Sequence, residues 1–67
     1  MNPKGEALEA LNENGYEFLR HGHDHDLYWN KELNSRIPVS RGTGFSKKDR
    51  DRILQEIRQA KRRKGLK

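Results

Sequence analysis

The chain of 67 residues has no cysteine and little apolar material. Without cysteine it forms no disulfide and no thiolate metal site. Hydrophobic residues make up 30% of the chain. No apolar run is long enough for a signal peptide or a membrane span. We therefore expect a soluble, cytoplasmic protein with one small domain, whose core needs nearly every large apolar side chain.

Charge of both signs is abundant, but it is divided unevenly along the chain. Residues 1–34 contain 3 basic and 7 acidic residues, a net charge of −4. Residues 35–67 contain 12 basic and 3 acidic residues, a net charge of +9. This asymmetry indicates a polyanion such as nucleic acid as the partner of the second half. A well-solvated helix with a basic tail is the competing interpretation.

The spacing of apolar residues predicts two helices. One is expected at residues 3–13 and the other at residues 46–61, because apolar side chains recur there at the period of one helical face. Ser46, with Asp49 three residues later, resembles a capping box at the start of the second helix. The remaining segment, KRRKGLK, is too charged to pack, so we expect a basic tail at residues 61–67.

Three short segments between the helices predict β-strands, because apolar and polar residues alternate in them. They are residues 16–21, 25–29 and 35–39. The three residues 22–24 are a connection short enough for an antiparallel hairpin, and Pro38 indicates that its strand lies at an edge of the sheet or ends there. We expect an α+β fold in the order α-β-β-β-α, with two helices packed on one face of a three-stranded antiparallel sheet. It forms a single domain over residues 1–60.

The string RHGHDHDLYW, residues 20–29, contains all three histidines. His21, His23 and His25 would share one face only if the chain stayed extended, and the expected turn argues against a three-histidine metal cage. A zinc site of imidazole and carboxylate ligands is a weaker alternative, and a plain solvated loop is another. We expect no metal ion and no cofactor.

The order of short motifs around these histidines forms a further pattern. His25 stands five residues after Arg20, and Tyr28 stands three residues after His25. The motifs are, in order, Gly15-Tyr16, Arg20, His25, Tyr28, Ile37-Pro38-Val39 and Ile53-Leu54. This order resembles the HicA family of bacterial toxins, which are small ribonucleases with a fold like that of the double-stranded-RNA-binding domain (dsRBD). The similarity covers about residues 7 to 58.

The resemblance implies the toxin of a type II toxin–antitoxin system, with RNA as its substrate and a HicB-type antitoxin as its protein partner. The activity implied is that of a metal-independent endoribonuclease that cleaves messenger RNA, with His25 as general acid/base. An imidazole, with a reference pKa near 6.5, suits proton transfer while the RNA 2′-hydroxyl attacks the phosphorus. The candidates for RNA contact are Arg20, Arg36, Arg41, Lys47 and Lys48.

Some positions depart from the family pattern. His23-Asp24 stands where the family has Gly-Ser, and Ser40-Arg41 stands where many members have a second histidine. We expect Asp24 or Asp26 to favour the imidazolium form of His25 by charge attraction. The alternative function is a non-catalytic RNA-binding module on the same fold.

Overall fold

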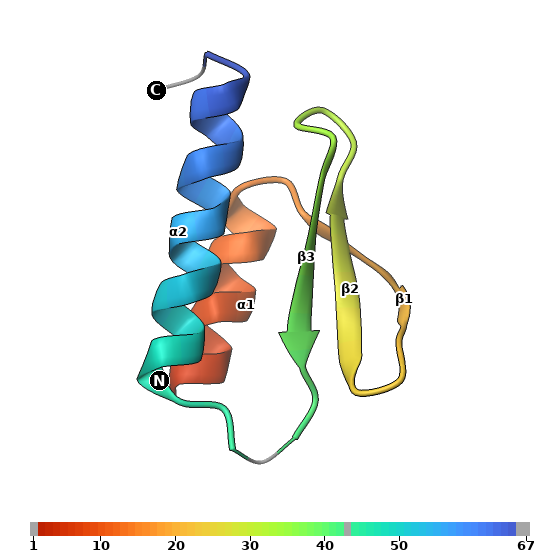
Figure 1. Ribbon diagram of the computed structural model, residues 1–67, viewed down its shortest axis with the longest axis vertical. Coiled ribbons are helices and arrows are strands. Elements are labelled where there is room, and N and C mark those ends of the chain that lie inside the picture. The colour runs from red at the N-terminus through yellow and green to blue at the C-terminus, as the bar shows by residue number, and fades with distance from the viewer. Residues whose placement is uncertain (1, 43, 66–67) are drawn as a thin grey trace.

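The computed structural model describes residues 2–42 and 44–65. Its elements are α1 (Pro3–Glu13), β1 (Glu17–His21), β2 (His25–Asn30), β3 (Ser35–Ser40) and α2 (Lys47–Arg63). The strands form an antiparallel sheet in the order β1-β2-β3, and both helices lie together on the side of β3 (Figure 1). The predicted α+β fold and the order α-β-β-β-α are therefore confirmed. No helix in the described residues is long and apolar enough to cross a membrane.

The core lies between the two helices and one face of the sheet. Ile37 and Val39 on β3 are almost completely buried there, and Tyr28, the cross-strand neighbour of Ile37, packs against this core. The other buried apolar residues are Ala7, Leu11, Tyr16, Leu33, Ile53, Ile57 and Ala60. Asp26, Tyr28 and Asn30 of β2 point to the core side of the sheet. Since side chains alternate along a strand, His25, Leu27 and Trp29 point to the opposite face, which we call the open face.

Both helices are capped at their starts, and the cap of α2 is the one that the sequence predicts. The Oδ1 atom of Asn2 accepts a hydrogen bond from the Gly5 N–H at 2.7 Å, and Pro3 occupies the first turn, where its missing N–H is tolerated. At the start of α2, the Ser46 N–H donates to Asp49 Oδ2 at 2.9 Å. These bonds occupy polar groups that the helix itself leaves unpaired.

The end of α2 differs from the prediction. The helix runs to Arg63 rather than to residue 61, so the first part of the predicted tail is helical. Ala60 is fully buried and its carbonyl accepts the Lys64 N–H at 3.3 Å, which holds the last turn in place. The three basic residues of this turn also meet the partial negative charge of the helix C-terminus. Residues 66–67 of the predicted tail lie outside the described residues.

The hairpin of β1 and β2 turns at residues 22–24, as expected, but β1 is irregular. Its register shifts between Phe18 and Arg20, which places a bulge at Leu19. As a result Phe18 lies beside Tyr28 on the core side, whereas Arg20 lies opposite Leu27 on the open face. The strand begins at Glu17, one residue later than predicted. All residues of β1 are exposed, including Phe18 and Leu19.

Candidate functional site

The open face of the sheet carries the predicted histidine. His25 is exposed at the first position of β2, directly opposite Ser40 of β3. Leu27 and Trp29 follow on the same face of β2, opposite Pro38 and Arg36. Because directly paired residues point to the same face of a sheet, the pairings gather one imidazole and a row of polar and aromatic groups on one surface.

Two of the predicted RNA-contacting arginines lie on this face. Arg20 is paired with Leu27 across the β1–β2 hairpin, and Arg36 is paired with Trp29 across the β2–β3 hairpin. The Arg36 guanidinium lies over the Trp29 ring, with 5.2 Å between the guanidinium carbon and the ring centroid. Such a cation–π contact orders both side chains.

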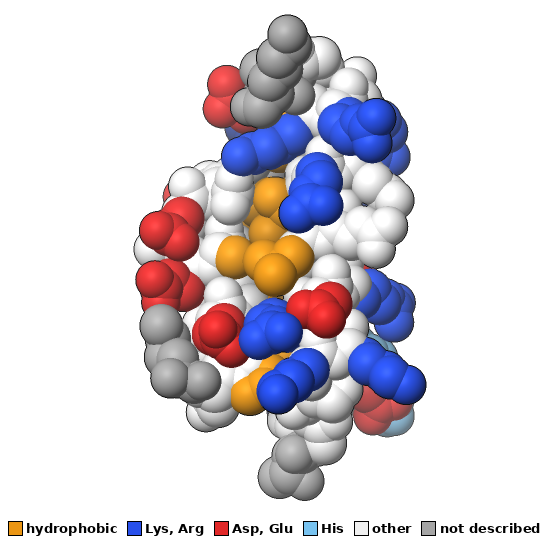
Figure 2. Space-filling view, turned by 90° about the vertical axis from the view of Figure 1, so that its left-hand side faces the viewer, with side chains coloured by type: hydrophobic (Ala, Val, Ile, Leu, Met, Phe, Trp, Pro, Cys, Tyr) orange, Lys and Arg blue, Asp and Glu red, His pale blue; other side chains and the backbone are white. Residues whose placement is uncertain are grey.

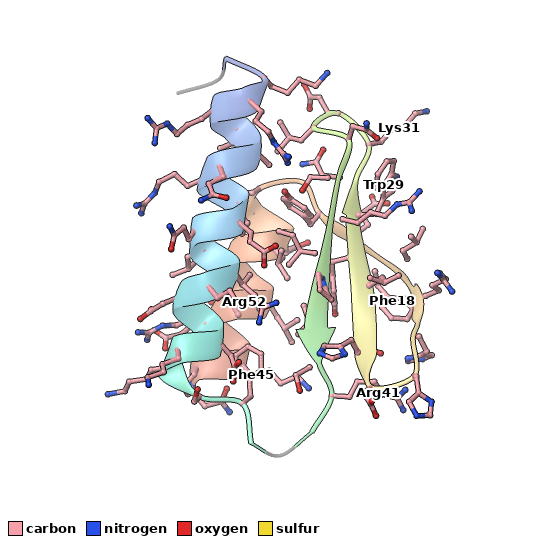
Figure 3. The ribbon with its side chains drawn as sticks, in the orientation of Figure 1. Phe18, Trp29, Lys31, Arg41, Phe45 and Arg52 are labelled. Carbon is pink, nitrogen blue, oxygen red and sulfur yellow. The ribbon has the colours of Figure 1, made fainter. Side chains whose placement is uncertain are left out.

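His25 lies in a shallow hollow between the sheet and α2. The other lining residues are Pro38, Ser40, Phe45, Asp49, Arg52 and Ile53. Arg52 projects from α2 toward the sheet side, and Phe45 lies below it in the segment that leads into the helix (Figure 3). The hollow therefore contains one imidazole, one guanidinium and one carboxylate.

Asp49 is the carboxylate in this hollow, and its hydrogen-bonding capacity is partly used. Its Oδ2 accepts from the Ser46 N–H at 2.9 Å and from the Ser46 hydroxyl at 3.2 Å. The backbone hydrogen bond from Ser46 is the main reason that the pKa of Asp49 lies below its usual value, and the charge of Arg52 adds to the effect. Asp49 is therefore ionised near neutral pH and is not a proton donor there.

The other two histidines lie elsewhere. His21 ends β1 on the core side of the sheet, and its Nδ1 is 2.7 Å from Asp26 Oδ1. His23 is in the turn and is almost fully exposed, with its Nε2 at 4.0 Å from Asp24 Oδ1. The expectation that Asp26 flanks the imidazole of His25 is therefore wrong, because alternate residues of β2 point to opposite faces.

Arg41 is placed differently from the other predicted RNA contacts. Its Nη1 donates to the Gly22 carbonyl at 3.1 Å, and its Nε lies 3.7 Å from Asp26 Oδ1. These contacts fasten the hairpin turn to the end of β3, on the side of Asp26 and away from His25. Arg41 therefore stabilises the turn between β1 and β2. It does not lie on the open face.

The two predicted lysines occupy the first turn of α2 and differ in direction. Lys48 precedes Arg52 by four residues, so the two are neighbours on the helix surface. Lys47 precedes Asp51 by four residues, and Asp51 lines a groove between the two helices instead. Lys48 is thus a helix-surface neighbour of one residue of the His25 hollow, but neither lysine is among the residues that line the hollow. Arg52, which the sequence analysis missed, is the helix cation closest to the predicted site.

Many of the charged side chains that are not near His25 lie on the outer face of the two helices. Figure 2 shows several acidic side chains along the left-hand edge of this face, most of the basic ones farther right, and apolar groups in the middle, while acidic and basic side chains alternate in the lower half. Glu6, Glu9 and Glu13 of α1 line the groove together with Leu54 and Arg50 of α2. The Arg50–Glu6 ion pair, at 2.9 Å, joins the helices. The basic side chains of residues 35–65 are therefore distributed over several surfaces of the molecule.

In the described part of the chain, no group of three or more histidine, cysteine, aspartate or glutamate side chains is arranged to hold a metal ion. The histidines diverge because His21 and His25 are on opposite faces of the sheet, with His23 in the turn between them. Besides His25, the charged side chains that the strand pairings place on the open face are those of Glu17, Arg20 and Arg36.

Comparison of the chain with models of protein families, with curated proteins and with solved structures finds no match. Function is therefore inferred from the open face itself and from the order of motifs in the sequence. The fold and the site define a small α+β domain with a partly exposed sheet face, on which one imidazole and charged side chains lie beside Leu27, Trp29 and Pro38.

Proposed function

We propose that this chain is a metal-independent endoribonuclease of the HicA type, the toxin of a type II toxin–antitoxin system. In this proposal it cleaves messenger RNA with His25 as general acid/base. The observation that supports it best is the position of His25, which is exposed at the start of β2 in one hollow with the Arg52 guanidinium. This arrangement offers a proton-transfer group beside a phosphate-binding group.

The chemistry needs little more than these two groups. RNA supplies its own nucleophile, the 2′-hydroxyl, so the protein moves protons and stabilises the charge that develops on the phosphorane. The planar guanidinium of Arg52 is suited to two phosphate oxygens at once. The Arg52 side chain is 73% exposed, and its contact with Glu56 is loose, with 3.9 Å between Arg52 Nε and Glu56 Oε2. A phosphate can therefore compete with Glu56 for this guanidinium.

The rest of the open face supports a strand of RNA as the substrate. Arg20 and Arg36 flank the central strand there, and Trp29 offers an aromatic surface to an unpaired base. In this proposal a HicB-type antitoxin inhibits the enzyme by covering the open face and excluding RNA.

One observation favours the second candidate, a non-catalytic RNA-binding module on the same fold. Asp49 is ionised in the hollow of His25, and a carboxylate repels a phosphate. The two candidates differ in whether the bound RNA is cut.

A cleavage assay with matched histidine variants distinguishes them. Purified protein is incubated with an unstructured RNA in the presence of EDTA. We expect cleavage to persist, and to fall by about 10²–10⁴-fold in His25→Ala. The control, His21→Ala, removes a histidine with a carboxylate partner on the other face, and we expect it to keep most of the activity. Both variants are expected to fold, since neither imidazole is buried.

Other outcomes have distinct meanings. Full activity in His25→Ala would refute the assignment of the general acid/base. Tight binding with intact RNA would favour the binding module, and activity that EDTA abolishes would indicate a metal-dependent reaction.

A further inference from the structure

A second hollow lies at the other end of the open face, between the β2–β3 turn and the C-terminal half of α2. Its volume is about 440 Å³, which lies in the range of small-molecule sites. Its lining includes Trp29, Asn34, Arg36, Glu56, Gln59 and Arg63. Figure 3 shows Trp29 near the end of the sheet opposite to Phe45. Aromatic, amide and charged side chains thus surround one concave space.

Trp29 gives this hollow a flat apolar surface. The ring is partly exposed, and the Arg36 guanidinium lies over one of its faces, with 5.2 Å between the guanidinium carbon and the ring centroid. Bases stack on guanidinium planes as well as on aromatic rings, so Trp29 and Arg36 together form the stacking surface. Unpaired bases of RNA stack on such rings, and stacking alone is sequence-tolerant because every base has a π-face. A preference for one base therefore needs a polar group at the edge of the ring.

Glu56 provides that group. Its Oε2 atom is buried and has no hydrogen-bond partner within residues 2–42 and 44–65. The nearest cationic atom, Arg52 Nε, lies 3.9 Å away, which is beyond hydrogen-bond distance. A buried acceptor without a donor is unfavourable and uncommon in folded proteins. The side chain as a whole is 37% exposed, and the terminal torsion of glutamate is soft, so either oxygen can turn toward the hollow.

We infer that this hollow is a guanine-binding subsite, in which the base stacks on Trp29 and the Glu56 carboxylate accepts hydrogen bonds from its Watson–Crick edge. Guanine presents two adjacent donors there, N1–H and the N2 amino group, which match the two oxygens of a carboxylate. Adenine and cytosine present one amino group beside an acceptor nitrogen, and uracil presents one N–H between two carbonyls. The inference rests on the proposed function in taking RNA as the ligand.

The subsite is separate from the proposed site of cleavage. His25 and Trp29 are four residues apart on β2, which corresponds to about 13 Å along a strand. One nucleotide does not cover both, so the guanine is at a position displaced along the RNA from the cut. Arg36, directly opposite Trp29, is placed to pair with a phosphate next to the bound guanine.

Binding without cleavage tests this inference directly. The probes are short 2′-O-methyl oligouridylates with one central guanine, inosine, adenine or cytosine, whose blocked 2′-oxygen prevents the cutting reaction. Trp29 is the only tryptophan of the chain, so quenching of its fluorescence reports on the subsite itself. We expect the guanine probe to bind at least about fivefold more tightly than the adenine probe, and inosine, which lacks the N2 amino group, to lie between them.

Two matched variants test whether Glu56 is the residue that recognises the guanine base. Glu56→Gln keeps the shape of the side chain but leaves one acceptor, and we expect the guanine preference to fall below about twofold. Glu9→Gln makes the same change of charge on the outer face of α1 and should keep the preference. Circular dichroism checks that both variants are folded.

Three results would overturn the inference: equal affinity for all probes, no quenching of Trp29 by any of them, or an unchanged preference in Glu56→Gln. Guanine-selective binding by a protein that cuts no RNA would leave the subsite standing and refute the nuclease proposal. If the protein cleaves RNA in a reaction that depends on His25 but shows no preference for the guanine probe, the nuclease proposal would stand and the subsite would be refuted.

Discussion

Asn30, at the end of β2, is a buried polar residue that joins two turns of the chain. Its Nδ2 donates to the Asn14 carbonyl at 2.8 Å, after the end of α1. Its Oδ1 accepts from the Leu33 N–H at 2.9 Å, inside the β2–β3 turn. The residue is 4% exposed, so water does not replace these bonds easily. We predict that Asn30 contributes more to stability than most polar residues of this protein.

The size of the effect follows from the two bonds. Asn30→Ala leaves one carbonyl and one N–H without partners, and each such group costs about 1–3 kcal/mol when it is buried. The Asn14 bond is only partly buried, so we expect a total loss of about 2–4 kcal/mol. A domain of this size has a free energy of unfolding of about 3–10 kcal/mol, at about 0.05–0.15 kcal/mol per residue. The melting temperature should fall by on the order of 10–25 °C.

Urea and thermal unfolding, followed by circular dichroism, measure this loss. The control is Asn12→Ala, since Asn12 is exposed on α1 and alanine has the higher helix propensity. It should leave stability unchanged or slightly raised. Asn30→Asp keeps an acceptor for the Leu33 N–H but turns an oxygen toward the Asn14 carbonyl. We expect it to be destabilised at neutral pH. A loss below about 0.5 kcal/mol in Asn30→Ala, the range of ordinary surface substitutions, would refute this reasoning.

Two further predictions concern the turn before β1 and the cap of α2. Gly15 has a φ of +84°, and an added Cβ would lie 3.2 Å from Asn30 Nδ2. Gly15→Ala should therefore lower the free energy of unfolding by about 1–2 kcal/mol, measured in urea. An unchanged urea midpoint would contradict this prediction. Because the Ser46 N–H lowers the pKa of Asp49, the cap contributes stability at neutral pH that is lost as the pH falls through that lowered pKa. Melting of Asp49→Ala and of the original protein should therefore differ at pH 7 and converge in acid, and a constant difference down to about pH 2, well below the usual aspartate pKa, would be evidence against the cap.

The element order could be predicted because apolar spacing is a local property of the sequence. The stripe of Ile53, Ile57 and Ala60 indicates a helix, and the buried positions confirm it. The bulge at Leu19 could not be predicted, since it depends on how β1 and β2 fit together. The role of Asn30 could not be predicted either, because nothing in the segment NKELN shows that its amide is enclosed by residues on both sides.

The candidate site was predicted unevenly for a similar reason. The spacing of motifs singles out His25, and the hairpin places it at the start of β2. Arg52 and Glu56 escaped notice because their role depends on how α2 is rotated against the sheet, which the sequence does not state. The available signal was the spacing of Lys48, Arg52 and Glu56, which are four residues apart in turn and therefore lie along one face of a helix. Arg41 was assigned to RNA on charge alone, whereas its contacts tie the hairpin turn to β3.

The alternation of β2 separates structural from functional residues within one strand. Tyr28 and Asn30 face the core side, where they pack and hold the turns, while His25 and Trp29 face the open side. Changes on the open side can therefore alter what the strand contacts without removing core packing. Changes on the core side affect every residue of the open face at once, because they move the strand that carries it. A test of function on this protein accordingly needs substitutions at alternate positions of β2, with the fold measured in each.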